Sequence, residues 1–237
     1  MSLLEGRVAL VTGASRGIGA AAAEALASQG ATVIRVARTL REGAYGRFQD
    51  VPCDLTDAEQ VDQLAAGVLQ RYGPPEVVVS NAGAFLLQPL EATQPAELEL
   101  QLAVNIKAPF AVAKGFLPAM RGAGRGSFIT VGSVADHIGF PENAAYAASK
   151  YGLRGLHETL LAEYRDTGVR LTLVSPGPTD TAVWDPFDPD QREGFIPRAE
   201  MLRPADVAEA ILFVATRPPH VLIDWLRLGP TGKASHG

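Results

Sequence analysis

Apolar residues along this chain of 237 residues occur in short runs that alternate with longer stretches of helical periodicity. The short runs are rich in Val, Ile and Leu and lack polar alternation, which is typical of strands buried on both faces of a parallel sheet. Strands are predicted over residues 8–12, 32–37, 50–55, 77–79, 127–131, 169–174 and 221–228. Helices are predicted over residues 16–29, from 56 onward, 96–120, 143–167 and 204–216.

This alternation predicts a single α/β domain over residues 1–237, because right-handed crossovers join successive parallel strands. The expected fold is a Rossmann-type doubly wound parallel sheet of about seven strands with helices on both faces. Thr56 and Glu59 have the offset of a capping box, and the helix over 96–120 is expected to be kinked or restarted near Pro109. Residues 176–204 show no clear period, so we expect a substrate loop or lid at about 178–203.

Charge and composition exclude several classes of partner. The net charge is -5 and basic residues are scattered, so neither nucleic acid nor an anionic membrane is expected to bind. No apolar stretch is long enough to cross a membrane, and no secretory signal is expected. The single cysteine, Cys53, fits a reducing compartment, so a cytoplasmic location is predicted. The four histidines and Cys53 show no metal-ligand spacing, and no metal is expected.

A glycine-rich turn separates the first predicted strand from the first helix. Its sequence is Thr12-Gly13-Ala14-Ser15-Arg16-Gly17-Ile18-Gly19. Glycines let backbone N–H groups approach a pyrophosphate closely, and the following helix N-terminus adds partial positive charge. Glycines also serve ordinary tight turns, but the context of strand, turn and helix favours a dinucleotide site.

The end of the second strand indicates which nicotinamide cofactor is used. An NAD site places an acid there for the ribose 2′-OH, whereas this strand ends in Val36-Ala37-Arg38-Thr39. Arg38 and Arg16 could both grip a 2′-phosphate, which guanidinium binds in bidentate fashion. The alternative is that both are solvated surface residues. The sequence therefore predicts NADP(H) in preference to NAD(H).

Tyr146 and Lys150 lie four residues apart in a predicted helix, so the phenol and the ammonium share one face. A nearby ammonium is expected to lower the phenol pKa from its usual value of about 10, which suits a general acid/base. A surface pair of these two residues is the alternative. Ser133 follows a predicted strand at the edge where open α/β sheets bind ligands, so its hydroxyl could hold a substrate oxygen.

Taken together and in this order, these motifs resemble the short-chain dehydrogenase/reductases of about this length, over almost the whole chain. The resemblance adds Asn105, from Val104-Asn105, to Ser133, Tyr146 and Lys150 as a catalytic tetrad. It also implies cofactor contacts from further segments: Asp54 with Leu55 near adenine, Asn81-Ala82-Gly83 along the cofactor, and Pro176-Gly177 with Thr179 and Thr181 beside the nicotinamide carboxamide.

The resemblance implies how these residues act. Ser133 and Tyr146 would hydrogen-bond the substrate oxygen, Lys150 would bind the nicotinamide ribose, and Asn105 would hold a water in a proton relay. The expected reaction transfers a hydride between NADP(H) and a small carbonyl or alcohol substrate. Relatives that it resembles include 3-oxoacyl-carrier-protein reductases. A dehydrogenase of small ketones or secondary alcohols is the alternative, and a non-catalytic regulator that senses dinucleotide is a rival from another class.

Several positions depart from the family pattern or stay open. Asp136 stands where Gly is common, so a charge is expected at the rim of the cleft, and His137 is expected to be a rim residue. Residues 221–230 lack the frequent Gly-rich ending, so the expected homo-oligomer is either a tetramer or a dimer. The aromatic residues of the long loop could line a substrate pocket or merely pack the loop: Trp184, Phe187 and Phe195.

Overall fold

A single sheet of eight strands forms the centre of the protein, whose computed structural model describes residues 2–231. Its strands are β1 (Val8–Thr12), β2 (Thr32–Val36), β3 (Gly43–Tyr45), β4 (Phe48–Val51), β5 (Val77–Ser80), β6 (Gly126–Val131), β7 (Val169–Pro176) and β8 (Trp225–Leu228). Their order is β3-β4-β2-β1-β5-β6-β7-β8. All neighbours pair in parallel except β3, which runs antiparallel to β4.

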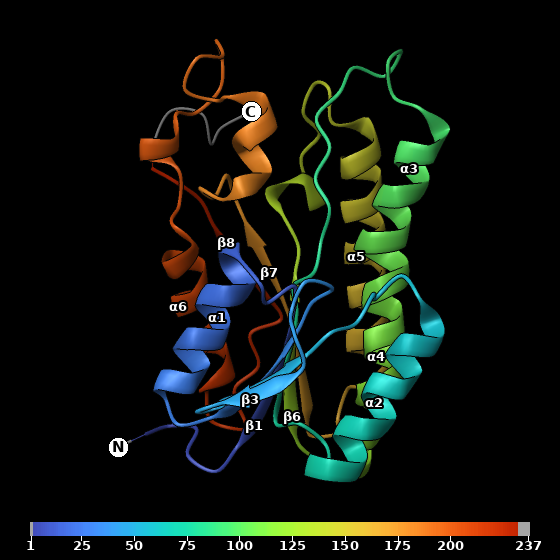
Figure 1. Ribbon diagram of the computed structural model, residues 1–237, viewed down its shortest axis with the longest axis vertical. Coiled ribbons are helices and arrows are strands. Elements are labelled where there is room, and N and C mark those ends of the chain that lie inside the picture. Colours follow the sequence, from blue (N-terminus) through green and yellow to red (C-terminus); the bar gives the residue numbers. More distant parts are fainter. Residues whose placement is uncertain (1, 232–237) are drawn as a thin grey trace.

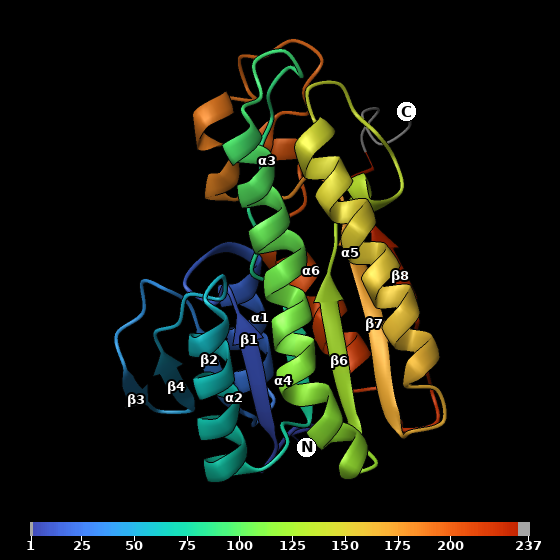
Figure 2. The same ribbon diagram turned by 90° about the vertical axis from the view of Figure 1, so that its right-hand side faces the viewer.

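Helices cover both faces of this sheet. They are α1 (Gly17–Ser28), α2 (Ala58–Tyr72), α3 (Pro95–Leu102), α4 (Ala108–Gly122), α5 (Ala144–Glu163) and α6 (Pro204–Ala215). In Figure 1, α1 and α6 lie on one side of the strands, and α2, α4 and α5 lie on the other. Figure 2 shows α3 and α4 end to end beside α5. The predicted doubly wound Rossmann-type fold is confirmed.

Successive residues of the apolar strands point into two separate cores, which explains why these strands show no polar alternation. Leu10 of β1 and Val78 of β5 pack against the layer of α2 and α4. Their neighbours Val11 and Val79 pack against α1 and α6 on the opposite face. Because both faces of each strand are covered, the strands fix the sheet firmly between two helical layers.

The structure differs from the sequence prediction at the edges of this sheet. An eighth strand, β3, forms a hairpin with β4 around Gly46, whose φ of 60° favours glycine. β4 ends at Val51, so most of the expected strand over 50–55 is the exit from the strand, and β8 begins only at Trp225. Hairpin strands of three or four residues are too short to give a clear period, and β3 was therefore not predicted.

Two helix boundaries also carry information. The predicted capping role of Thr56 is wrong: Asp57 caps α2 by accepting the N–H groups of Glu59 and Gln60 at 3.0 and 3.2 Å. The Thr56 hydroxyl instead donates to Asp54 at 2.7 Å. The predicted interruption near Pro109 is found as a π turn, η1 (Ala103–Lys107), between α3 and α4.

The strand order reverses between β1 and β5, where the chain winds outward in both directions from the middle of the sheet. In open α/β sheets a crevice forms outside the carboxyl ends of the strands at such a point. The glycine-rich turn follows β1, and Asn81 follows β5, so both segments border this crevice. The fold thus brings the predicted motifs to one edge of the sheet.

Candidate active site

A cavity of about 930 Å³ opens at the carboxyl edge of the sheet. Most of the predicted site residues line it: Gly13, Ser15, Arg16, Gly17, Ile18, Arg38, Asp54, Leu55, Asn81, Ala82, Gly83, Ser133, Tyr146, Lys150, Pro176, Gly177, Thr179 and Thr181. Two predicted residues, Gly19 and Asn105, lie behind its wall. The structure therefore collects segments from seven parts of the chain around one cavity.

The glycine-rich turn is shaped by close backbone approach. Gly13 and Gly17 have φ values of +65° and +57°, which side chains rarely adopt. A Cβ atom on Gly13 would lie 2.9 Å from the Cα of Ala82, and one on Gly19 would overlap the Gly13 carbonyl. Gly19 thus lets the helix pack against the turn rather than contact a ligand. No side chain caps the N-terminus of α1, and its first turn carries no acid, so its N–H groups suit an anion.

Asn81 joins the ends of β1 and β5 below this turn. Its Nδ2 donates to the Thr12 carbonyl at 2.9 Å, and its own backbone N–H donates to the Thr12 hydroxyl at 2.9 Å. The backbone N–H of Ala82 shares that hydroxyl at 3.1 Å. These bonds hold the two strand ends in register, so the Asn81-Ala82-Gly83 segment forms a fixed part of the cavity wall.

Arg16 and Arg38 are both exposed and both line the cavity, beyond the carboxyl ends of the neighbouring strands β1 and β2. Neither guanidinium is paired with a carboxylate in the part of the chain that the structure describes. Asp54 lies nearby, and hydrogen bonds from Thr56 lower the pKa of its carboxyl, with a smaller contribution from the Arg38 charge. An anion that entered this end would meet two cations without displacing an existing partner.

Ser133 and Tyr146 come together from β6 and α5. Ser133 follows β6 and caps the short 3₁₀ turn η2 (Val134–Asp136), where its hydroxyl accepts the Ala135 N–H at 3.2 Å. Tyr146 lies in the first turn of α5, where burial raises the pKa of its phenol, and Ser133 is close enough that its side chain lowers this pKa by a smaller amount. Two hydroxyl groups thus face the cavity side by side, a suitable arrangement for holding one substrate oxygen.

Lys150 lies one helical turn beyond Tyr146 and is buried. Its ammonium donates to the Val131 carbonyl at 3.3 Å and lies 5.7 Å from the centre of the Tyr146 ring. Burial lowers the pKa of Lys150 to about 8, although the charge of Asp136 opposes this. Burial also raises the pKa of Tyr146 to about 12, so the expected lowering of that pKa by Lys150 is wrong. The physical reason is desolvation, which opposes both charged forms in this site.

Asn105 lies in the π turn and is fully buried. Its Nδ2 contacts the Ala84 carbonyl and the Ser149 hydroxyl, both at 2.9 Å, and its Oδ1 accepts the Ala84 N–H at 2.9 Å. Its side chain therefore ties the segment after Gly83 to α5. Pro109 has no N–H to donate to the Asn105 carbonyl four residues earlier, so that backbone oxygen lacks its usual α-helical donor.

The prediction that Asp136 places a charge at the rim of the cleft is wrong. Asp136 is a buried carboxylate behind Ser133. It accepts the Ser133 backbone N–H at 3.2 Å and the Ser175 hydroxyl at 2.5 Å, and it contacts Nδ1 of His137 at 2.7 Å. Trp225 donates in turn to Ser175 at 2.9 Å. Sequence reasoning missed this network because β8 brings Trp225 to it only in the folded chain.

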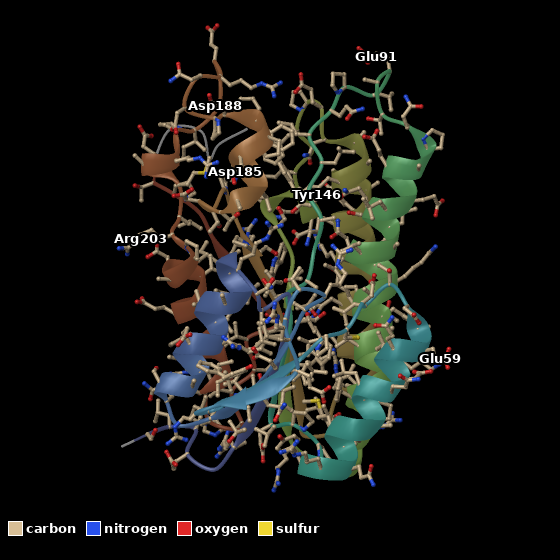
Figure 3. The ribbon with its side chains drawn as sticks, in the orientation of Figure 1. Glu59, Glu91, Tyr146, Asp185, Asp188 and Arg203 are labelled. Atoms are coloured by element: carbon tan, nitrogen blue, oxygen red, sulfur yellow. The ribbon has the colours of Figure 1, made fainter. Side chains whose placement is uncertain are left out.

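The loop after β7 forms a further wall of the cavity. Figure 3 shows Asp185 and Asp188 on this loop, to one side of Tyr146. Thr181 approaches the glycine-rich turn so closely that a Cβ atom on Gly17 would lie 3.2 Å from its methyl group. Trp184 and Phe195 line the cavity, and Phe187 packs behind them against Phe85. Phe85 was not singled out from the sequence, because nothing local marks it as a cavity residue.

Metal clusters and membrane-spanning helices are both absent from the described residues. Within residues 2–231, no group of three or more His, Cys, Asp or Glu side chains is arranged to hold a metal ion. None of the helices that the structure describes is both long and apolar enough for a membrane span.

Known proteins of similar sequence are oxidoreductases. A family model for short chain dehydrogenase matches residues 7–192. An uncharacterized oxidoreductase of Staphylococcus aureus is 33% identical, with 97% of this chain and 100% of that protein covered. A D-threitol dehydrogenase of Mycolicibacterium smegmatis is also 33% identical, with 90% and 87% covered.

Solved structures give the same result. A metagenomic short-chain oxidoreductase in complex with NADP superposes with a TM-score of 0.81 and 36% identity, covering 98% of this chain and 100% of its own. An alcohol dehydrogenase of the archaeon Thermococcus sibiricus, complexed with 5-hydroxy-NADP, has a TM-score of 0.82 and 28% identity over 95% and 97% of the two chains. The order of motifs, the cavity and these relatives agree, and the chain belongs to the short chain dehydrogenase family.

Proposed function

We propose that this protein is an NADP(H)-dependent oxidoreductase that reduces a carbonyl compound, or oxidises the corresponding alcohol, with Tyr146 as general acid and base. The observation that carries the proposal is the meeting of Ser133, Tyr146 and Lys150 at the end of a cavity that also contains Arg16 and Arg38. The NADP complexes of similar proteins support the choice of cofactor. A non-catalytic dinucleotide sensor would not need an intact tetrad, which here comprises these three residues and Asn105.

The cofactor would be held along the edge of the sheet. Gly13 and Gly17 would admit the pyrophosphate to the N-terminus of α1, and Arg16 and Arg38 would bind the 2′-phosphate. Asp54 and Leu55 would border the adenine, and the segment from Pro176 to Thr181 would border the nicotinamide. When bound, NADPH supplies the hydride that reaches the carbonyl carbon.

Tyr146 and Ser133 would both hydrogen-bond the carbonyl oxygen. As negative charge develops on that oxygen, Tyr146 gives it the phenolic proton, and the product is the neutral alcohol. The ammonium of Lys150 stabilises the phenolate that remains and contacts the ribose. The backbone carbonyl of Asn105, for which Pro109 offers no N–H, would hold a water that returns a proton through Lys150. Alcohol oxidation follows the same steps in reverse.

The whole chain would work as one catalytic domain. Within it, residues 178–203 would act as a lid over the substrate. The bridge between Thr179 and Leu202 joins the two ends of this segment, so it can move as a unit. The 3-oxoacyl substrate is one proposal for this site, and a small ketone or secondary alcohol is the alternative. The cytoplasmic location and the homo-oligomer, tetramer or dimer, remain predictions.

The test is a comparison of NADPH and NADH in binding and in turnover over a panel of ketones, aldehydes and a 3-oxoacyl thioester. We expect NADPH to bind more tightly and to be oxidised with at least one carbonyl class. Arg38→Ala should weaken NADPH binding by about 10- to 100-fold, the loss of a charge-assisted contact, and leave NADH binding nearly unchanged. Equal losses for both nucleotides would show that Arg38 does not bind the 2′-phosphate.

A further inference from the structure

An aromatic wall faces the reacting phenol. We use this name for Phe85, Trp184, Phe187 and Phe195. The Phe85 ring stands edge-on to Tyr146 with centroids 5.0 Å apart, and it also packs against Trp184 at 5.0 Å and Phe187 at 5.5 Å. Trp184 contacts Phe195 at 6.3 Å. These distances and tilted geometries are those of favourable aromatic packing, so the four rings hold one another in place.

The wall offers the substrate flat apolar surface and no hydrogen bond of its own. The single polar atom among its four side chains, Nε1 of Trp184, already donates to the Thr179 carbonyl at 3.1 Å. Leu87, Phe140 and Ile196 extend the apolar lining around it. Apolar lining with a few convergent polar groups is typical of sites that bind small apolar molecules.

Arg192, the one cation that the described chain places beside the wall, already has partners. Arg192 is in an ion pair with Glu142, and its guanidinium also stacks on Phe195 at 4.5 Å. Asn143 donates to the Leu86 carbonyl at 3.3 Å, whereas its buried Oδ1 has no hydrogen-bond partner among the described residues. Glu193 adds a negative charge to the lining. Among the described residues beside the wall, a carboxylate or phosphate would therefore meet no cation that lacks a carboxylate partner, and the charge of Glu193 would repel it.

From these contacts we propose that the substrate is a neutral carbonyl compound with an aryl group beside the reacting carbon. This inference rests on the proposed carbonyl reduction at Tyr146. With the oxygen between Ser133 and Tyr146, the aryl ring would lie against Phe85 and Trp184. The site would select against carboxylated and phosphorylated carbonyl compounds, because their negative groups would lose water without gaining a cationic partner.

Three ketones test this selection with NADPH: acetophenone, its carboxylated analogue 4-acetylbenzoate, and cyclohexyl methyl ketone. We expect kcat/KM for 4-acetylbenzoate to be about 100-fold below that for acetophenone. Conjugation changes the intrinsic reactivity of acetophenone. We therefore compare, between variants, the ratio of kcat/KM for acetophenone to kcat/KM for cyclohexyl methyl ketone. Phe85→Leu, which keeps apolar volume but removes the ring, should lower that ratio about fivefold.

Phe213→Leu is the matched control, because Phe213 is an exposed aromatic residue of α6 that does not line the cavity. It should leave the ratio unchanged. Calorimetric binding of 1-phenylethanol and of its 4-carboxylate to the NADP⁺ complex provides a readout that needs no turnover, and only the neutral alcohol should bind. Preference for the carboxylate in either assay, or an unchanged ratio in Phe85→Leu, would overturn the inference. Failure of every carbonyl to oxidise NADPH would refute the proposed function, whereas the binding assay would still decide this inference.

Discussion

Two regions of the cavity differ in how they are held. We define the catalytic floor as Asn105, Ser133, Asp136 and Lys150. These residues lie in the π turn, in the segment that follows β6 and in α5, and all four are buried, with exposed fractions of 8% or less. The loop over 178–203 has only short 3₁₀ turns, and half of its residues are exposed. Its internal ion pairs lie at the surface, such as Arg198 with Asp180 and Asp185 at 2.7 Å.

This difference separates chemistry from selection. Proton transfer needs donor and acceptor atoms fixed within a fraction of an ångström, which buried side chains on long elements supply. Substrate selection needs a surface that can differ between relatives sharing one fold, which a loop supplies. Changes in the floor should therefore alter kcat and its pH dependence, and changes in the loop should alter KM.

The largest effect is expected from removing the acid. Tyr146→Phe keeps the ring against Phe85 but deletes the hydroxyl, so kcat should fall by about 10³-fold or more. NADPH binding, measured by fluorescence titration, should change little because the 2′-phosphate and pyrophosphate contacts remain. A variant that retained a tenth of the activity would show that another group supplies the proton.

The pH dependence should follow Lys150. Reduction requires a protonated Tyr146, whose pKa is about 12, and a charged Lys150, whose pKa burial lowers to about 8. Both groups are in their active forms below pH 8, so kcat/KM for reduction should fall about tenfold per unit as pH rises above this value. Steady-state rates over a pH series measure this. The fall should move to higher pH in Lys150→Arg, whose guanidinium stays charged.

A smaller effect is expected from the buried charge behind Ser133. Asp136 raises the pKa of both Lys150 and Tyr146, so Asp136→Asn should move the alkaline fall in reduction to lower pH by about one unit. Ser175→Ala is the matched control, because it removes one hydrogen bond to the same carboxylate and keeps its charge. Equal shifts in the two variants would mean that packing, and not charge, explains the effect.

The smallest effect is expected from the loop. Arg198→Ala removes the contacts to Asp180 and Asp185, which fasten the segment that carries Trp184. We expect a rise of about threefold in the KM for the carbonyl substrate, an unchanged kcat and little change in Tm, because exposed ion pairs contribute weakly to stability. A loss in kcat comparable to that of a floor variant would remove the distinction between the two regions.

The sequence by itself determined the family, the fold class and the placement of most cavity residues. Apolar runs without polar alternation required a sheet covered on both faces, and the glycines after β1 required a tight turn beside β5. These are local patterns whose physical meaning does not depend on distant residues. Gly13 was placed at the cavity by this regular winding, whereas Tyr146 and Lys150 were placed there by the resemblance of the ordered motifs to the short-chain dehydrogenase/reductases.

Only the tertiary structure decided what surrounds those residues. Asp136 is buried and not at the rim because Ser175 and Trp225 come to it from β7 and β8. The raised pKa of Tyr146 reflects desolvation by the folded chain, which no spacing of residues encodes. Phe85 packs between Tyr146 and Trp184 although these three residues lie far apart in sequence. Burial and contact between distant segments depend on packing of the whole chain, and local sequence patterns do not carry that information.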